Sequence, residues 1–131
     1  MIVHFPVGLL ISGVVFEIYG ALRNDEVAET AGRYNIRFGF WCLFPVLLVG
    51  FLGMISLENT EEFKDFLSSH LTFALCTAGL FFLAMLVSRY LRQPLGRALY
   101  FIIIGVGGIC LLTTGYFGGE LVHRFGVSTH Q

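Results

Sequence analysis

The sequence predicts an all-α integral membrane protein, a four-helix bundle with up-down-up-down topology and both termini on the outer side of the membrane. Three observations lead to this fold class. Of the 131 residues, 56% are hydrophobic and only 13% are charged, which is not the composition of a soluble domain. Long charge-free stretches alternate with short polar connections, and the basic residues gather in two of these connections. We expect residues 1–131 to form one domain.

The apolar stretches are long enough to cross a bilayer. Phe38–Leu57, Phe66–Ser88 and Ala98–Gly119 contain no Asp, Glu, Lys or Arg, and each has at least 20 residues. A helix of this length spans a hydrocarbon core of about 30 Å. A fourth stretch, at the N-terminus, is interrupted by His4 and Glu17. With their polar flanks included, we expect helices over residues 3–22, 25–56, 60–91 and 94–124.

The first expected helix contains a proline and a carboxylate. Pro6 is tolerated because the first turn of a helix has no internal partner for the missing N–H. Glu17 lies near the other end, and a carboxylate inside a membrane span indicates a functional residue by default. Its structural interpretation is an ion pair with a nearby cation, and its functional interpretation is proton movement. The nearest cations in the sequence are Arg23, Arg33 and Arg37.

Each of the second, third and fourth expected helices begins with residues that are typical of a helix N-terminus. Asn24 is a candidate N-cap for the second helix, with Asp25 at the positive end of the helix dipole. Asn59 and Glu62 have the spacing of a capping box before the third helix, and Pro94 suits the first turn of the fourth. The connections are therefore short, so sequence neighbours pack antiparallel and the first and third helices lie diagonally.

The basic residues predict the orientation in the membrane. Six of the eight flank the first and third connections, whereas the second connection is acidic. The positive-inside rule places the basic connections in the cytoplasm. We therefore expect a multi-pass protein of the bacterial inner membrane with both termini outside. The six are Arg23, Arg33, Arg37, Arg89, Arg92 and Arg97.

The fourth helix carries a stripe of small residues that leads to two ionisable side chains, Glu120 and His123. One interpretation of the stripe is a helix-packing face. The other is a surface where a flat ligand approaches the backbone, because glycine has no side chain. On a helical period the stripe consists of Gly105, Gly108, Leu112, Gly115, Gly119 and His123.

Three histidines are expected near the outer side of the membrane. His4 opens the first helix, His70 lies in the outer part of the third, and His123 ends the fourth. A single histidine there often only extends its ring toward water, but three at one level indicate a ligand site. Haem b is a flat, hydrophobic group whose iron accepts two imidazoles, and helix bundles hold such cofactors in their interior.

His4 and His70 are the expected axial ligands of this haem. Diagonal helix axes lie about 11–14 Å apart, which suits two imidazoles with an iron between them. His123 is expected to replace either ligand or to donate a hydrogen bond from the second shell. The glycines that would let the porphyrin approach the backbone are Gly8, Gly115 and Gly119.

Glu120 has three expected roles, and it also suggests a metal-ion site as an alternative to the haem site. It is expected to cap local donors, to pair with Arg124, or to accept a proton when a quinol is oxidised. Three imidazoles together with Glu120 also form a plausible shell for zinc or copper. No nucleophile motif, phosphate loop or basic nucleic-acid face is present. A non-catalytic role is therefore expected.

Two terminal motifs resemble a known family. Val3–Leu10 reads Val-His-Phe-Pro-Val-Gly-Leu-Leu and Thr114–Val122 reads Thr-Gly-Tyr-Phe-Gly-Gly-Glu-Leu-Val. Together with His70, they are similar to the predicted four-helix membrane proteins called domain of unknown function 2231. The sequence departs from the family pattern at His123, where an aromatic residue is usual. The resemblance implies association with c-type cytochromes and other respiratory components, and hence electron transfer near the outer face.

These observations lead to one principal functional hypothesis and two alternatives. The principal hypothesis is a membrane haem b electron-transfer subunit of a larger respiratory or photosynthetic complex, which relays electrons between a quinol or partner subunit and an outer c-type cytochrome. The first alternative is a cofactor-free structural subunit that packs through the glycine stripe. The second is a membrane protein that binds a metal ion through its His and Glu side chains.

Overall fold

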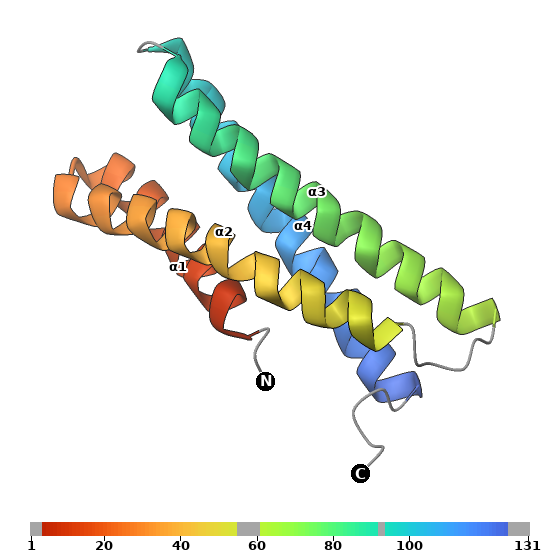
Figure 1. The fold of residues 1–131 in the computed structure, drawn as a ribbon. Helices are drawn as coiled ribbons and strands as arrows, with labels where there is room; N and C mark the ends of the chain where they lie inside the picture. The colour runs from red at the N-terminus through yellow and green to blue at the C-terminus, as the bar shows by residue number, and fades with distance from the viewer. Residues whose placement is uncertain (1–3, 55–60, 92–93, 126–131) are drawn as a thin grey trace.

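The structure, a computed structural model, describes residues 4–54, 61–91 and 94–125 and consists there of four long helices (Figure 1). Each is long and apolar enough to span a membrane, and each described end lies within two residues of the expected bound. The all-α four-helix fold class is confirmed, and the side of the membrane on which the termini lie stays a prediction. The helices are α1 (His4–Arg23), α2 (Glu26–Met54), α3 (Glu61–Tyr90) and α4 (Leu95–Phe125).

The bundle is built from two antiparallel hairpins. α1 packs along α2 and α3 packs along α4, whereas the contacts between hairpins, α1 with α4 and α2 with α3, are fewer (Figure 1). Among the described residues, no Cα of α1 lies within 8 Å of a Cα of α3. The first and third helices are therefore diagonal, as expected.

The α1–α2 hairpin is held together by glycines spaced seven residues apart, Gly13 and Gly20 on α1 with Gly32 and Gly39 on α2. A Cβ built on Gly32 would lie 2.7 Å from the backbone nitrogen of Glu17 and 2.8 Å from the carbonyl oxygen of Gly13. A seven-residue repeat keeps one side of a helix against its partner. The buried face of α1 follows this repeat, in steps of four and three, through Pro6, Leu10, Gly13, Glu17 and Gly20.

The turn between α1 and α2 uses Asn24 and Asp25 differently from the expectation. Asn24 adopts a left-handed conformation with φ 53°, and the N–H of Asp25 donates to the carbonyl of Gly20 at 2.9 Å, which is the pattern that ends a helix. Asp25 Oδ1 accepts from the N–H groups of Val27 and Ala28 at 3.0 and 3.1 Å. Asp25 is thus the N-cap of α2, and the expectation for Asn24 is wrong. The candidate cap Asn59 lies outside the described residues.

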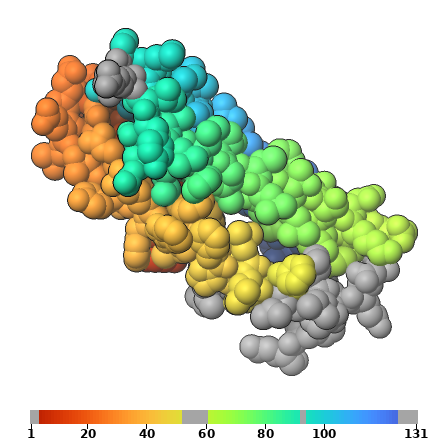
Figure 2. Space-filling view, turned by 45° about the horizontal axis from the view of Figure 1, so that its top comes forward, coloured from red at the N-terminus to blue at the C-terminus, as the bar shows by residue number. Residues whose placement is uncertain are grey.

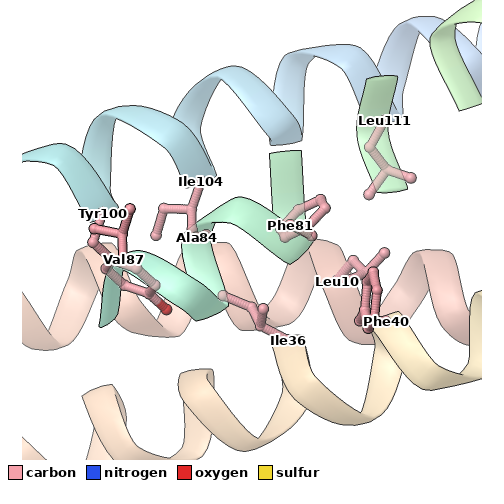
Figure 3. Packing of buried hydrophobic residues seen from close by; sticks show 9 residues of the cluster. All are labelled: Leu10, Ile36, Phe40, Phe81, Ala84, Val87, Tyr100, Ile104 and Leu111. Carbon is pink, nitrogen blue, oxygen red and sulfur yellow. The ribbon is translucent and has the colours of Figure 1, made fainter. Parts of the chain in front are cut away.

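The core lies where all four helices meet. Phe81 of α3 is fully buried, and its ring lies 3.4 Å from a Cβ built on Gly107 of α4. Figure 3 shows the buried apolar side chains from the four helices pointing toward one another. They are Leu10, Ile36, Phe40, Phe81, Ala84, Val87, Tyr100, Ile104 and Leu111.

The outer surface of the bundle is apolar. On the face shown in Figure 2, α2 (orange to yellow) and α3 (teal to green) lie side by side. Exposed side chains on these two helices include Phe44, Leu48, Leu75 and Leu83. Lipid chains solvate such side chains as well as a protein core does, so this surface suits a bilayer.

Candidate functional site

His70 lies against α4 in a defined orientation. Its Nδ1 is 3.0 Å from the carbonyl oxygen of Thr114, and its Cε1 lies 3.1 Å from a Cβ built on Gly118. Since a carbonyl oxygen only accepts, Nδ1 carries the proton in this hydrogen bond, and in the neutral imidazole the lone pair is then on Nε2. The structure therefore presents His70 as an imidazole that is able to bind a metal through Nε2.

Thr114 and Gly118 are site residues that the sequence analysis missed. Gly118 gives the imidazole its space, and Thr114 supplies the acceptor while its hydroxyl donates to the carbonyl of Cys110 at 2.8 Å. The signal that would have identified them is a seven-residue repeat in steps of four and three along α4. It runs through Ile104, Gly107, Leu111, Thr114, Gly118 and Leu121, the face that packs on α3.

His4 and His123 are exposed at the same end of the bundle. We call this the histidine end, defined by His4, His70 and His123. His4 shares an exposed face of α1 with Gly8 and Ile11, so the structure does not seat it against His70. In the described part of the chain, no three His, Cys, Asp or Glu side chains are grouped so as to hold a metal ion. The expected zinc or copper shell therefore does not form there.

Glu120 takes one of its three expected roles. It accepts a hydrogen bond from Nε of Arg124. The guanidinium of Arg124 also lies 3.7 Å from a carboxylate oxygen of Glu62 and 5.1 Å from the centre of the Phe66 ring. These contacts tie the end of α4 to the start of α3. Of the three expected roles, the structure therefore shows the ion pair between Glu120 and Arg124.

The glycine stripe on α4 is largely open within the chain. A Cβ built on Gly105, Gly115 or Gly119 would meet no atom of the described residues within 4 Å, and the same holds for Gly8 of α1. The exception is Gly108, whose built Cβ lies 3.8 Å from Val14. The stripe is therefore not the face on which α4 packs against α3. As far as the described residues show, Gly105, Gly115 and Gly119 are open to a ligand or a partner.

At the opposite end, Glu17 is buried and has one hydrogen bond. Its side chain has no exposed area, Oε1 accepts from the hydroxyl of Tyr100 at 2.8 Å, and Oε2 has no hydrogen-bond partner among the described residues. The expected ion pair with an arginine is wrong, because no cation of the described residues lies within 4.0 Å of this carboxylate. Glu17 lies in the buried seam of α1, where Tyr100 of α4 reaches it, while Arg33 turns to Glu29.

Glu29 joins the two hairpins. Its carboxylate binds Arg33 of the same helix at 3.4 Å and Arg97 of α4 at 2.7 Å. The side chain of Glu29 is only 13% exposed, so solvent screens these pairs less than it would on an open surface. Local sequence does not reveal this role of Glu29, because its second partner, Arg97, is 68 residues away.

Two pockets adjoin this network at what we call the basic end, defined by Arg33, Arg37, Arg89 and Arg97. The first has a volume of about 320 Å³ and the second about 350 Å³, and Arg37 lines both. The first is lined mainly by polar side chains, among them Glu17, Glu29, Arg33, Ser88, Arg97 and Tyr100. The second is lined by Arg37, Trp41, Phe82, Met85, Leu86 and Arg89.

Four spanning helices with an apolar outer surface and polar groups at both ends define a multi-pass membrane protein. The chain belongs to the family described as predicted membrane protein, domain of unknown function 2231, whose model matches residues 1–131. This confirms the resemblance seen in the two terminal motifs. No curated protein and no solved structure matches the chain.

Proposed function

We propose that this protein binds haem b at its histidine end and transfers electrons there, as a subunit of a larger respiratory or photosynthetic complex. The observation that carries the proposal is the 3.0 Å hydrogen bond between Nδ1 of His70 and the carbonyl of Thr114. Histidines that bind a metal commonly donate their other ring N–H to a carbonyl oxygen in this way, which fixes the tautomer and the ring orientation. This hydrogen bond would therefore orient His70 so that Nε2 is the nitrogen that binds the iron.

The surroundings of His70 fit a flat, apolar cofactor. Gly115 and Gly119 leave the backbone of α4 open on the neighbouring face. Phe73, three residues after His70 on α3, stacks on Phe117 of α4 with ring centres 5.7 Å apart, which adds apolar side chains at this end of the α3–α4 hairpin. His4 is the proposed second ligand, because it lies at the same end on the helix diagonal to α3; since it does not contact His70 in the structure, haem binding would have to bring it to the iron. Bound haem b would supply reversible one-electron transfer at its iron.

The proposed partners follow from where the histidine end lies. If the basic connections face the cytoplasm, as the positive-inside rule predicts, the histidine end lies at the outer face. A single haem at the outer face cannot by itself carry electrons across the bilayer. The subunit would therefore exchange electrons with a quinol or a membrane partner on one side and with an outer c-type cytochrome on the other.

The haem ligands are tested by the reduced-minus-oxidised spectrum of the purified protein. We expect a b-type signal that is abolished in His70→Ala and His4→Ala, because each variant removes an iron ligand. The matched control His123→Ala makes the same change at the same end and should retain the haem with a shifted potential. Loss of haem in His123→Ala with retention in His4→Ala would move the second ligand to α4. A colourless wild-type protein from which no haem can be extracted would refute the proposal.

The open glycine stripe favours a second candidate function, that of a structural subunit that packs against a partner helix. Small residues allow close approach of helices in a membrane, and none of the described helices packs on Gly115 or Gly119 in that way. On this account the chain binds no cofactor. It would instead be required for the assembly or stability of its complex.

Leucine substitutions on the stripe test the second candidate. Gly115→Leu with Gly119→Leu should release the subunit from its complex on a native gel of solubilised membranes, with loss of most of the assembled band. Gly79→Leu is the matched control, because Gly79 is equally open but lies on α3; it should leave the band unchanged. His4→Ala and His70→Ala should also be silent. Assembly that survives the stripe variants would exclude this candidate.

A further inference from the structure

We infer that the two pockets at the basic end together bind an anionic phospholipid whose head group carries hydroxyl groups, with the phosphate at Arg37 and a hydroxyl at Glu17. This inference does not depend on the haem proposal, because the two sites lie at opposite ends of the bundle. It rests on an excess of positive charge, an unpartnered buried carboxylate oxygen and an adjoining apolar wall.

The charge of the first pocket favours an anion. Arg33, Arg37 and Arg97 face two carboxylates, Glu17 and Glu29, which leaves one positive charge in excess even when both acids are ionised. Glu29 pairs with Arg33 and Arg97, whereas Arg37 has no ion pair with any acid of the described residues. Arginine binds phosphate oxygens through charge-assisted, often bidentate hydrogen bonds. A phosphodiester at Arg37 therefore balances the pocket.

Glu17 indicates which group the lipid head group carries beyond its phosphate. Its Oε2 is buried and receives no hydrogen bond from the described residues, and a buried acceptor of this kind is destabilising unless a ligand or water provides a donor. Glu17 lines the first pocket but has no exposed area in this structure, so lipid binding requires its carboxylate to turn toward the pocket, where a hydroxyl of a glycerol head group donates the hydrogen bond that Oε2 lacks. A choline group has no such donor, and an ethanolamine lipid is neutral overall and would leave the arginine excess unbalanced. The two requirements together point to a phosphatidylglycerol-type lipid.

The second pocket indicates a lipid rather than a soluble phosphate. It shares Arg37 with the first pocket and is walled by Trp41, Phe82 and Leu86, which are exposed on the apolar outer surface of α2 and α3. A phosphate at the shared arginine leaves the head group in the polar pocket and the acyl chains against the apolar wall. Arg89 lies beside the same phosphate position. Basic pockets between membrane helices are typical sites for anionic head groups.

The first test measures lipid retention by the purified, full-length protein in native mass spectrometry. Dioleoyl phosphatidylglycerol should be retained in preference to the phosphatidylcholine with the same chains. Arg37→Gln should weaken phosphatidylglycerol binding about fivefold, the contribution of one basic side chain near a membrane surface. Arg23→Gln is the matched control, because Arg23 is exposed at the same end and lines neither pocket; it should have no effect.

Arg37→Lys shows whether the effect depends on charge or on folding. It should keep most of the binding, and its helical circular dichroism should match that of the wild type. Equal losses in Arg37→Gln and Arg23→Gln would show diffuse surface charge and overturn the inference. Displacement of phosphatidylglycerol by millimolar inorganic phosphate would identify a soluble-anion site and would also overturn it.

The second test examines the hydroxyl at Glu17. Glu17→Gln keeps an oxygen for Tyr100 but replaces the accepting Oε2 by an amide N–H, so the lipid hydroxyl loses a charge-assisted hydrogen bond and can form only a weaker, neutral one as acceptor. We expect the wild type to prefer phosphatidylglycerol over phosphatidic acid, which has no glycerol head group, and Glu17→Gln to show a smaller preference. An unchanged ratio between the two lipids in Glu17→Gln would show that Glu17 does not bind the head group.

Discussion

Gly32→Ala is expected to destabilise the protein by about 3 kcal/mol or more. The added Cβ would lie 2.7 Å from the backbone nitrogen of Glu17 and 2.8 Å from the carbonyl oxygen of Gly13. Backbone atoms do not move aside as a flexible side chain does, so α1 and α2 must separate along their seam. Overpacking of this kind has costs at the upper end of the usual range. Thermal unfolding in detergent, followed by far-ultraviolet circular dichroism, measures the effect.

Gly8→Ala provides the matched control. It makes the same change in the neighbouring helix, at a glycine whose built Cβ meets no atom within 4 Å. Replacing an unpacked helical glycine by alanine removes conformational entropy from the unfolded chain, so this variant should be neutral or more stable by up to about 1 kcal/mol. Equal unfolding temperatures for the two variants would contradict the glycine-dependent packing of the hairpin.

Tyr100→Phe is expected to reduce the free energy of unfolding by about 1–3 kcal/mol. The hydroxyl of Tyr100 is the only hydrogen-bond donor to Glu17 among the described residues, at 2.8 Å, and Oε2 already has none. The variant leaves both oxygens of a fully buried side chain without a donor. Tyr116→Phe is the control, because Tyr116 is 60% exposed on the outer surface; its unfolding temperature should not change.

A double-mutant cycle separates this hydrogen bond from simple packing. Adding Glu17→Leu to Tyr100→Phe removes the orphaned carboxylate, so the double variant should be more stable than Tyr100→Phe alone. The coupling energy between the two positions is read from the four unfolding curves. Strictly additive effects would show that Tyr100 and Glu17 do not stabilise one another.

At the candidate sites, local sequence identified single residues but not their partners. His70 was a predicted ligand, yet the acceptor that orients it, Thr114, is 44 residues away. Glu17 was recognised as an unusual intramembrane acid, and nearby arginines were the natural partners in the sequence. Its actual donor, Tyr100, lies 83 residues further along the chain. Pairing across two hairpins cannot be deduced from spacing within one helix.

The sequence by itself determined the class of this protein and the positions of its helices. Apolar runs of at least 20 residues must cross the hydrocarbon core, because a backbone in lipid has to satisfy its hydrogen bonds within the helix. Short polar connections then require antiparallel neighbours. These constraints are local, so residue order alone is enough to apply them.

Only the tertiary structure decided which side of each helix faces its neighbours. In lipid, an apolar side chain is equally well solvated inside or outside the bundle, so hydrophobicity does not mark the inner face. The glycines of α4 at Gly115 and Gly119 remained open, whereas the close contact formed at Gly13, Gly20 and Gly32. Steric fit between backbones selects such contacts, and that fit exists only once the helices are placed together.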